Sequence, residues 1–180
     1  MATMQADLPT DFPCLRTHSG ADGVTSRLER MAPADLSAGE VLIRNRFAGV
    51  NYKDCLSILG RARIIESYPR IAGIEAVGEV VHSSDARFAP GQPVIVHGFR
   101  TGIAFDGGFA QYLRAPAAHV MPLPAGLDAW QAAVIGVPVG FALGTSKRLH
   151  QIFDPLVQLL KPISPLAWMP LALYTIKDAS

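Results

Sequence analysis

Short runs of alternating or β-branched apolar residues fill the chain from residue 11 to about residue 126, and Gly, Pro, Asp and Ser separate them. Such runs indicate strands, because side chains alternate between the two faces of a strand and those four residue types favour turns. The segment EVLIRNRFAGV alternates most clearly, with Val41 and Ile43 on one face and Leu42 on the other. This part of the chain is therefore predicted to be mainly β.

The other predicted elements follow from the same pattern. A hairpin with a longer loop is expected where FPCLRTH and VTSRLERM flank SGADG. One short helix is expected to begin near Asp54 and to end at Gly60, because glycine often terminates a helix. Many short strands at close spacing favour a barrel or a sandwich. The remaining predicted strands are AVGEVVHSS, QPVIVHG, FAQYLRAP and HVMPLP, and the turn ARFAPGQ joins the first two.

The pattern changes after Leu127. DAWQAAVIG predicts the start of a helix with Asp128 as its N-cap. An apolar segment interrupted by prolines then fills residues 136–180, and we expect an apolar helical tail there. No G-x-G-x-x-G or Walker A pattern occurs in the sequence, so neither a Rossmann domain nor a phosphate loop is predicted.

Composition narrows the class of protein. The chain of 180 residues has a net charge of +1, which gives no reason to expect a nucleic acid partner. Its two cysteines, Cys14 and Cys55, cannot form a disulfide framework and fit a reducing compartment. The N-terminus lacks the basic and apolar segments of a secretory signal. We therefore expect a cytoplasmic protein, although the mean hydropathy of +0.24 is high for a soluble chain.

Reactive side chains concentrate in the segment GVNYKD. There, an amide, a phenol, an amine and a carboxylate follow one another at a predicted strand-to-helix junction, in the order Asn51, Tyr52, Lys53 and Asp54. One interpretation is a turn in which Asp54 caps the helix and Lys53 is solvated. The other is a catalytic site, and the neighbouring segments favour it.

These neighbouring segments carry a family resemblance. YPRIAGIEAVGEVV, RFAPGQPVIV and DGGFAQYLRAP follow GVNYKD in order. Together they resemble the catalytic, GroES-like domain of the medium-chain dehydrogenase/reductase superfamily over roughly residues 11–136. More narrowly, residues 49–80 resemble the zinc-independent acrylyl-CoA reductase branch of the quinone oxidoreductases. The resemblance implies a GroES-like, partly open β-barrel with short helices, and NADPH-dependent reduction of an activated C=C bond in an enoyl-CoA or a quinone.

The resemblance also bears on metal binding. Zinc-containing relatives place a Cys-His pair where this chain has Asn51 and Tyr52, and a His-Glu pair where it has Ile74 and Glu75. A catalytic zinc needs three protein ligands of the Cys, His or carboxylate type. The five histidines are scattered, and the four-cysteine lobe of the zinc enzymes is absent from the sequence. We therefore predict no metal site.

By resemblance, the segment GVNYKD supplies the catalytic residues. Asn51 is implied to lie beside the nicotinamide, to bind the cofactor, and to donate a hydrogen bond to the substrate oxygen on which negative charge develops. Tyr52 is expected to donate to that oxygen or to supply the proton, with water as the alternative source. Asp54 is expected to orient its neighbours and to cap the helix.

A different resemblance covers residues 136–180. This part is similar to an internal fragment of an inner-membrane permease of the nitrate/sulfonate/taurine class of ABC importers, and PISPLAWMPLAL is its most specific stretch. An ordinary C-terminal helix pair is the alternative. The permease resemblance implies non-specific membrane association through the tail, and inner-membrane attachment as an alternative localisation.

The two resemblances predict three parts: an N-terminal extension (1–10), a GroES-like domain (11–135) and a permease-like fragment (136–180). Three functions remain open at this point. The first, which we favour, is the catalytic domain of a reductase, which is inactive alone because its cofactor-binding domain is missing. In this hypothesis a rearranged reading frame fused the catalytic domain to the tail. The second is a non-catalytic module that binds acyl-CoA or a quinone. The third is a membrane-attached permease fragment.

Overall fold

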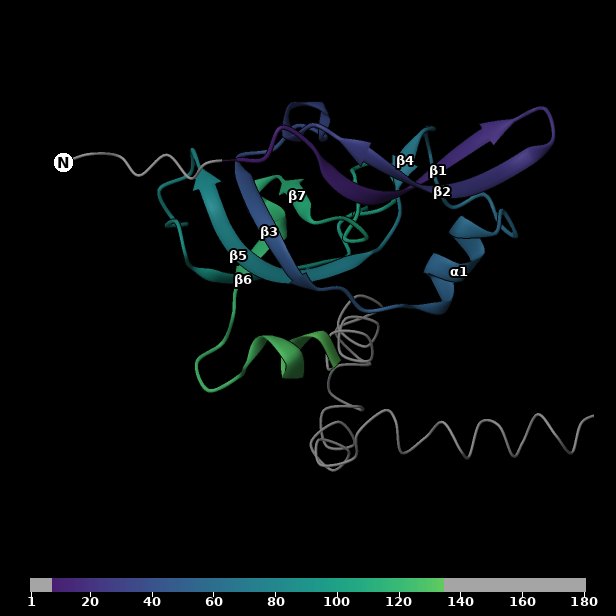
Figure 1. The fold of residues 1–180 in the computed structure, drawn as a ribbon. Helices are drawn as coiled ribbons and strands as arrows, with labels where there is room; N and C mark the ends of the chain where they lie inside the picture. The colour runs from purple at the N-terminus through teal and green to yellow at the C-terminus, as the bar shows by residue number, and fades with distance from the viewer. Residues whose placement is uncertain (1–7, 135–180) are drawn as a thin grey trace, which may run out of the picture. The chain divides into compact units, whose positions relative to one another are not determined.

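The computed structural model describes residues 8–134, which form two antiparallel β-sheets (Figure 1). The three-stranded sheet has the order β2-β1-β4, made by β1 (Phe12–Gly20), β2 (Gly23–Met31) and β4 (Arg70–Ile71). The five-stranded sheet has the order β7-β3-β5-β6-β8, made by β7 (Tyr112–Ala115), β3 (Val41–Phe47), β5 (Glu75–Ser83), β6 (Pro93–His97) and β8 (Val120–Pro122). The helices are α1 (Tyr52–Ile58) and the short 3-10 helices η1 (Pro33–Asp35) and η2 (Ala117–His119), and residues 129–134 are also helical. The predicted mainly β fold is confirmed.

Strand β3 takes part in both hydrophobic cores. Its odd-numbered residues Val41 and Ile43 face one core, as the alternation predicts, and Leu42 on the opposite face is buried in the other. The larger core is Val41, Ile43, Ala76, Val80, Phe88, Val94, Val96, Leu113, Ala115, Ala117 and Val120. The smaller core is Phe12, Cys14, Met31, Leu36, Leu42, Ile71 and Tyr112. Burial of these side chains is the main term that favours folding.

The hairpin of β1 and β2 is tighter than the sequence predicts. Gly20 pairs with Gly23, so the turn has two residues, Ala21 and Asp22, where a longer loop was expected. Gly23 has a φ of 104°, which side-chain-bearing residues rarely adopt. Glycine at this position therefore closes a short turn without steric strain.

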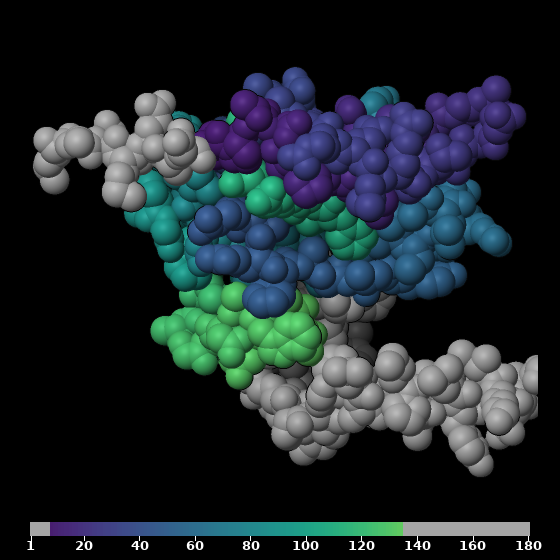
Figure 2. Space-filling view, viewed as in Figure 1, coloured from purple at the N-terminus to yellow at the C-terminus, as the bar shows by residue number. Residues whose placement is uncertain are grey.

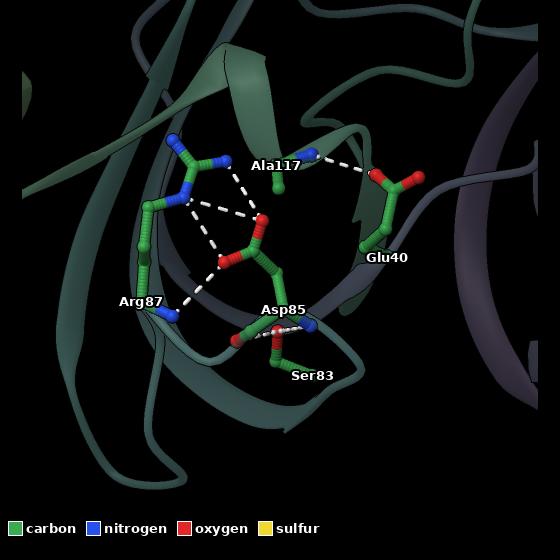
Figure 3. Close-up of polar contacts among 5 residues, drawn as sticks. All are labelled: Glu40, Ser83, Asp85, Arg87 and Ala117. Atoms are coloured by element: carbon green, nitrogen blue, oxygen red, sulfur yellow. Dashed lines mark hydrogen bonds and ion pairs between the residues drawn. The ribbon is translucent and has the colours of Figure 1, made fainter.

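The predicted turn between β5 and β6 is confirmed, and polar contacts hold it (Figure 3). The Asp85 carboxylate accepts hydrogen bonds from the Arg87 backbone N–H at 2.9 Å and from its guanidinium at 2.7 Å. The Ser83 hydroxyl donates to the Asp85 carbonyl and accepts from the Asp85 N–H, each at 3.0 Å. In the same view, the Ala117 N–H donates to Glu40 at 2.8 Å and fixes the start of η2.

Strand β4 and the loop after β6 carry contacts that the sequence pattern did not predict. Asp106 in this loop is buried and accepts hydrogen bonds from the N–H and hydroxyl of Ser37 at 2.9 and 2.8 Å. It also accepts one from the Ile71 N–H at 3.2 Å, and Arg70 lies 3.5 Å away. One carboxylate thereby joins three segments that are distant in the sequence.

Several predictions concern residues outside the described part of the chain. The apolar tail at 136–180 lies wholly outside it, and so does most of the proposed N-terminal extension. The helix predicted at Asp128 is confirmed for residues 129–134, since the Gln131 N–H donates to the Asp128 carboxylate at 2.7 Å. Within residues 8–134, we find no helix with the length and apolar character needed to cross a membrane.

Candidate active site

The site begins where the segment after β3 turns into α1. Asn51 is the N-cap, and Asp54, expected to begin the helix, is its third residue. The Asn51 backbone N–H donates to the Asp54 carboxylate at 2.8 Å. This is the reach-back contact of a capping box, in which the third helical residue satisfies a backbone donor at the N-cap. The prediction that Asp54 helps to cap the helix is correct, but it acts from inside the first turn.

Asp54 also ties α1 to the entry of β5. Its second carboxylate oxygen accepts a hydrogen bond from the Ile74 N–H at 3.0 Å, and the side chain is only 1% exposed. Burial raises the pKa of Asp54, and the backbone hydrogen bonds from Asn51 and Ile74, together with the nearby side-chain amide of Asn51, oppose that rise. Asp54 therefore orients its neighbours, as expected, and no described contact makes it a reactive group.

The side-chain amide of Asn51 carries an unused donor. Its nitrogen Nδ2 is buried and has no hydrogen-bond partner within residues 8–134. A buried polar group without a partner costs about 1–3 kcal/mol, so such a group calls for an explanation. Because the Asp54 carboxylate fixes the Asn51 backbone, the position of this donor is set by the fold, and the described residues supply no acceptor for it.

Tyr52 and Lys53 follow Asn51 in the sequence, but their side chains are exposed to solvent and not buried. The Tyr52 side chain is 79% exposed, and Lys53 is exposed as well. Neither side chain makes a hydrogen bond or an ion pair with any described residue. The four predicted site residues therefore divide into a buried, positioned pair, Asn51 and Asp54, and an exposed, unconstrained pair.

A second polar pair, Glu75 and His97, lies near Asp54, and the sequence pattern did not predict it. The register of β5 and β6 places Glu75 opposite His97, and the His97 ring nitrogen Nδ1 lies 2.8 Å from Glu75 Oε2. Glu75 is 4% exposed, and its other oxygen, Oε1, has no partner in the part described. The charge of Glu75 adds to the rise in the pKa of Asp54. A cross-strand His–Glu pair could have been found by aligning the two predicted strands, but their register was not predicted.

Close backbone contacts explain the glycines around this site. A Cβ added at Gly108 would lie 2.2 Å from the Glu75 carbonyl oxygen, so the role of this glycine is close approach to β5. Gly73, by contrast, has a φ of 101°, which side-chain-bearing residues rarely adopt.

The described residues bring together no group of three or more His, Cys, Asp or Glu side chains suited to a metal ion. At the two positions discussed above for zinc ligands, Asn51 caps α1 and Ile74 donates its N–H to Asp54. The absence of zinc stays a prediction. Elemental analysis of purified, untagged protein after mild chelation tests it, and stoichiometric zinc would contradict it.

Comparison with known proteins identifies the fold. Residues 37–125 match the family model "Alcohol dehydrogenase GroES-like domain". The predicted GroES-like fold is thereby confirmed, and strands β1 and β2, which precede the matched range, belong to the same described structure.

The relatives agree with this family. The chain is 37% identical over 145 residues to the Bacillus subtilis protein YhfP, named as a quinone oxidoreductase, covering 80% of this chain and 44% of YhfP. It is 38% identical over 109 residues to the acrylyl-CoA reductase AcuI of Ruegeria pomeroyi, covering 61% of this chain and 33% of AcuI. The crystal structure of the Salmonella enterica yhdH oxidoreductase in complex with NADP matches with a TM-score of 0.67 and 33% identity, over 69% of this chain and 38% of that one. These matches support the quinone oxidoreductase and acrylyl-CoA reductase branch of the medium-chain dehydrogenase/reductase superfamily.

The matches to transport permeases are of a different kind. The chain is 50% identical over 47 residues to the bicarbonate transport permease CmpB of Synechococcus elongatus, covering 26% of this chain and 17% of CmpB. The chain spans less than half the length of the reductases and a small part of the permease. Resemblances to two unrelated classes therefore occur in one sequence.

Proposed function

We propose that residues 11–135 are the catalytic domain of an NADPH-dependent, zinc-independent reductase of the acrylyl-CoA reductase and quinone oxidoreductase type. The observation that carries this proposal is the buried, unpartnered amide nitrogen of Asn51, held by Asp54 at the start of α1. The chain is similar in sequence to proteins named as a quinone oxidoreductase and an acrylyl-CoA reductase, and similar in fold to the Salmonella oxidoreductase.

The residues present fit a nicotinamide cofactor at this place. When bound, the cofactor supplies the hydride for the reduction. Asn51 would hold the cofactor or the acceptor through its side-chain amide, since Nδ2 has a hydrogen left to donate. The preference for NADPH over NADH is part of the proposal, and the crystal structure of the Salmonella relative contains NADP.

The reduction adds a hydride and a proton across an activated C=C bond, and negative charge develops on the conjugated oxygen. A preorganised donor aimed at that oxygen stabilises the charge, and loss of one such donor costs about 10²–10³ in kcat. Asn51 is the positioned donor, and Asp54 fixes its backbone. The exposed phenol of Tyr52 is within reach of solvent and of an incoming substrate, so it or a water molecule supplies the proton.

We further propose that the 180-residue chain does not catalyse this reaction alone. Hydride transfer needs the reacting atoms about 3–3.5 Å apart, and such positioning is worth about 7–11 kcal/mol. The described domain offers one wall of the required cleft, while a G-x-G-x-x-G segment for the dinucleotide is not found in the sequence.

A graft tests the proposal. Joining the Rossmann domain of a relative after Ile135 should produce NADPH oxidation with acrylyl-CoA or a quinone. Asn51→Ala in the graft should then lower kcat by about 10²–10³. The variant Tyr52→Phe tests the proton source: a lower kcat indicates the phenol of Tyr52, and an unchanged kcat indicates water. Exchange of the exposed Asp22 for Asn in the same graft is the control and should leave kcat unchanged. A folded, cofactor-binding graft without turnover, or NADPH consumption by the unmodified chain, would overturn the proposal.

The 47-residue match to a permease favours a second proposal for the tail. Residues 136–180 are a permease-like fragment that associates with membranes without spanning them stably. Fractionation of cells that express the full chain tests this association, and recovery of all the protein in the soluble fraction would contradict it.

A further inference from the structure

Three cationic side chains of the described chain have no partner within it, and all three lie in one short segment. Lys53, Arg61 and Arg63 are exposed, and none makes an ion pair or a side-chain hydrogen bond with residues 8–134. Every other Lys or Arg side chain in that range is engaged. Eight arginines pair with carboxylates, namely Arg16, Arg27, Arg30, Arg44, Arg46, Arg70, Arg87 and Arg100, and Arg114 donates to a backbone carbonyl.

We call Lys53, Arg61 and Arg63 the cationic segment. The carboxylates within and next to it do not neutralise its charge. Asp54 is buried and accepts the backbone hydrogen bonds described above, and Glu66 is paired with Arg100. Unpaired charges of one sign on one surface produce a positive potential that attracts anions. The segment therefore differs from the other described arginines, each of which has a carboxylate or a carbonyl partner.

The backbone that carries these charges is well fixed. The Ser26 hydroxyl of β2 donates to the Ile58 carbonyl at 3.0 Å, and the Arg61 N–H donates to the Leu56 carbonyl at 2.9 Å. Gly60 has a φ of 63°, and a Cβ added there would lie 2.6 Å from Val24 Cβ. The turn after α1 is thus pressed against the β1–β2 hairpin (Figure 1, Figure 2). The charged side chains extend from a rigid support.

The spacing of the cations points to an extended ligand. Lys53 lies at the first turn of α1 and Arg61 follows its last turn, and a helix of seven residues is about 10 Å long at about 1.5 Å per residue. An extended ligand can therefore meet Lys53 and Arg61 with separate groups. Arginine is also well suited to phosphate, because its planar guanidinium can donate two parallel hydrogen bonds.

We propose that the cationic segment binds the phosphate groups of an extended, pyrophosphate-bearing ligand whose other end reaches Asn51. This rests on the proposed function in one respect, namely that Asn51 marks the reacting end. Two molecules share this chemistry: the coenzyme A portion of a thioester substrate, and NADPH. A quinone has no phosphate, so the cationic segment does not increase its affinity. If the segment binds coenzyme A, this surface selects the thioester as the substrate.

Binding measurements on the full 180-residue chain test the proposal with coenzyme A, NADPH and inorganic pyrophosphate, by calorimetry at low and raised salt. The variant Lys53→Gln/Arg61→Gln/Arg63→Gln should bind coenzyme A at least about tenfold more weakly, because it loses three phosphate contacts. The matched control Arg27→Gln/Arg30→Gln/Arg87→Gln removes the same charge from exposed, carboxylate-paired positions and should bind as the unmodified chain does. Thermal unfolding of both variants confirms that they fold.

The outcomes distinguish coenzyme A from NADPH as the ligand of the cationic segment. Weakened binding of coenzyme A with NADPH unaffected assigns the segment to the substrate, and the reverse assigns it to the cofactor. Equal affinities of the two triple variants for all three molecules, or no binding of any of them to the unmodified chain at millimolar concentration, would overturn the site. If the Rossmann graft is inactive but coenzyme A still binds through these residues, the reductase proposal fails and the cationic site stands.

Discussion

At the scale of single residues, the candidate site depends on Asp54 more than on any reactive group. Its two oxygens accept the N–H groups of Asn51 and Ile74, which belong to separate segments. Asp54→Asn replaces one acceptor with an amide nitrogen that faces an N–H donor, so we expect a loss of about 1–3 kcal/mol in the free energy of unfolding. Asp22→Asn in the exposed hairpin turn is the control and should change stability little. Urea denaturation measures both variants, and equal stabilities would show that these two hydrogen bonds are weak.

Asp85 allows a test of the electrostatics. Hydrogen bonds from the side chain and the backbone of Arg87 lower the pKa of Asp85 from 3.8 to about 2. A lowered pKa in the folded state adds stability above the unfolded value, and this stability is lost as pH falls from 3.8 toward 2. In Arg87→Gln the pKa of Asp85 should move back toward 3.8, as measured by NMR titration of the carboxyl carbon. Raised salt should weaken the effect, because the pair is exposed.

At the scale of elements, alternation predicted most strands, because each face of β3, β5 and β6 meets a distinct environment. It did not predict β4, which has two residues and no period to detect. The loop after β6 was missed for a related reason. Its order depends on the buried Asp106, whose partners come from Ser37 and Ile71, and contacts between distant segments leave no local pattern.

In the candidate site, too, only features that depend on local sequence could be predicted. Asp54 could be found because a carboxylate at a predicted strand-to-helix junction indicates a helix cap, whereas the role of Asn51 was implied by the family resemblance. The pairing of Glu75 with His97 depends on the register between β5 and β6, and register is set by backbone packing rather than by either strand's own composition. The assignment of Tyr52 and Lys53 came from resemblance alone, and the structure adds only that both are exposed.

Gly78 allows a prediction about how β3 and β5 pair. Its φ is not positive, so this position does not need glycine for a left-handed backbone. A Cβ there would lie 2.3 Å from the Arg44 carbonyl oxygen, so Gly78→Ala should force the two strands apart. We expect a loss of about 1–3 kcal/mol in unfolding free energy, as for other overpacked sites.

Gly20→Ala is the matched control for this prediction. A Cβ at Gly20 would have no heavy atom within 4 Å, so its substitution should be nearly neutral. Equal thermal unfolding temperatures for the two variants would contradict the close approach of β3 and β5.

At the scale of the whole molecule, the chain combines a folded domain with a segment of different character. Both hydrophobic cores lie within residues 12–120. The capping contact at Asp128 begins the last helical segment that the structure describes. The stability of the domain should therefore not depend on residues 137–180. The candidate site likewise draws all its contacts from residues before 110.

Truncation after Gly136 tests this division. The tail contains AAVIGVPVGFALG, an apolar run of about 13 residues, whereas a transmembrane helix needs about 20. An apolar segment that is too short to span a bilayer favours aggregation or surface association. We expect the truncated chain to be more soluble and to unfold at the same temperature as the full chain. Replacement of residues 137–180 by a Gly/Ser segment of equal length is the control that separates apolar character from length, and it should behave like the truncation. Loss of the unfolding transition in both variants would instead show that the tail is part of the core, and the division at Gly136 would then be wrong.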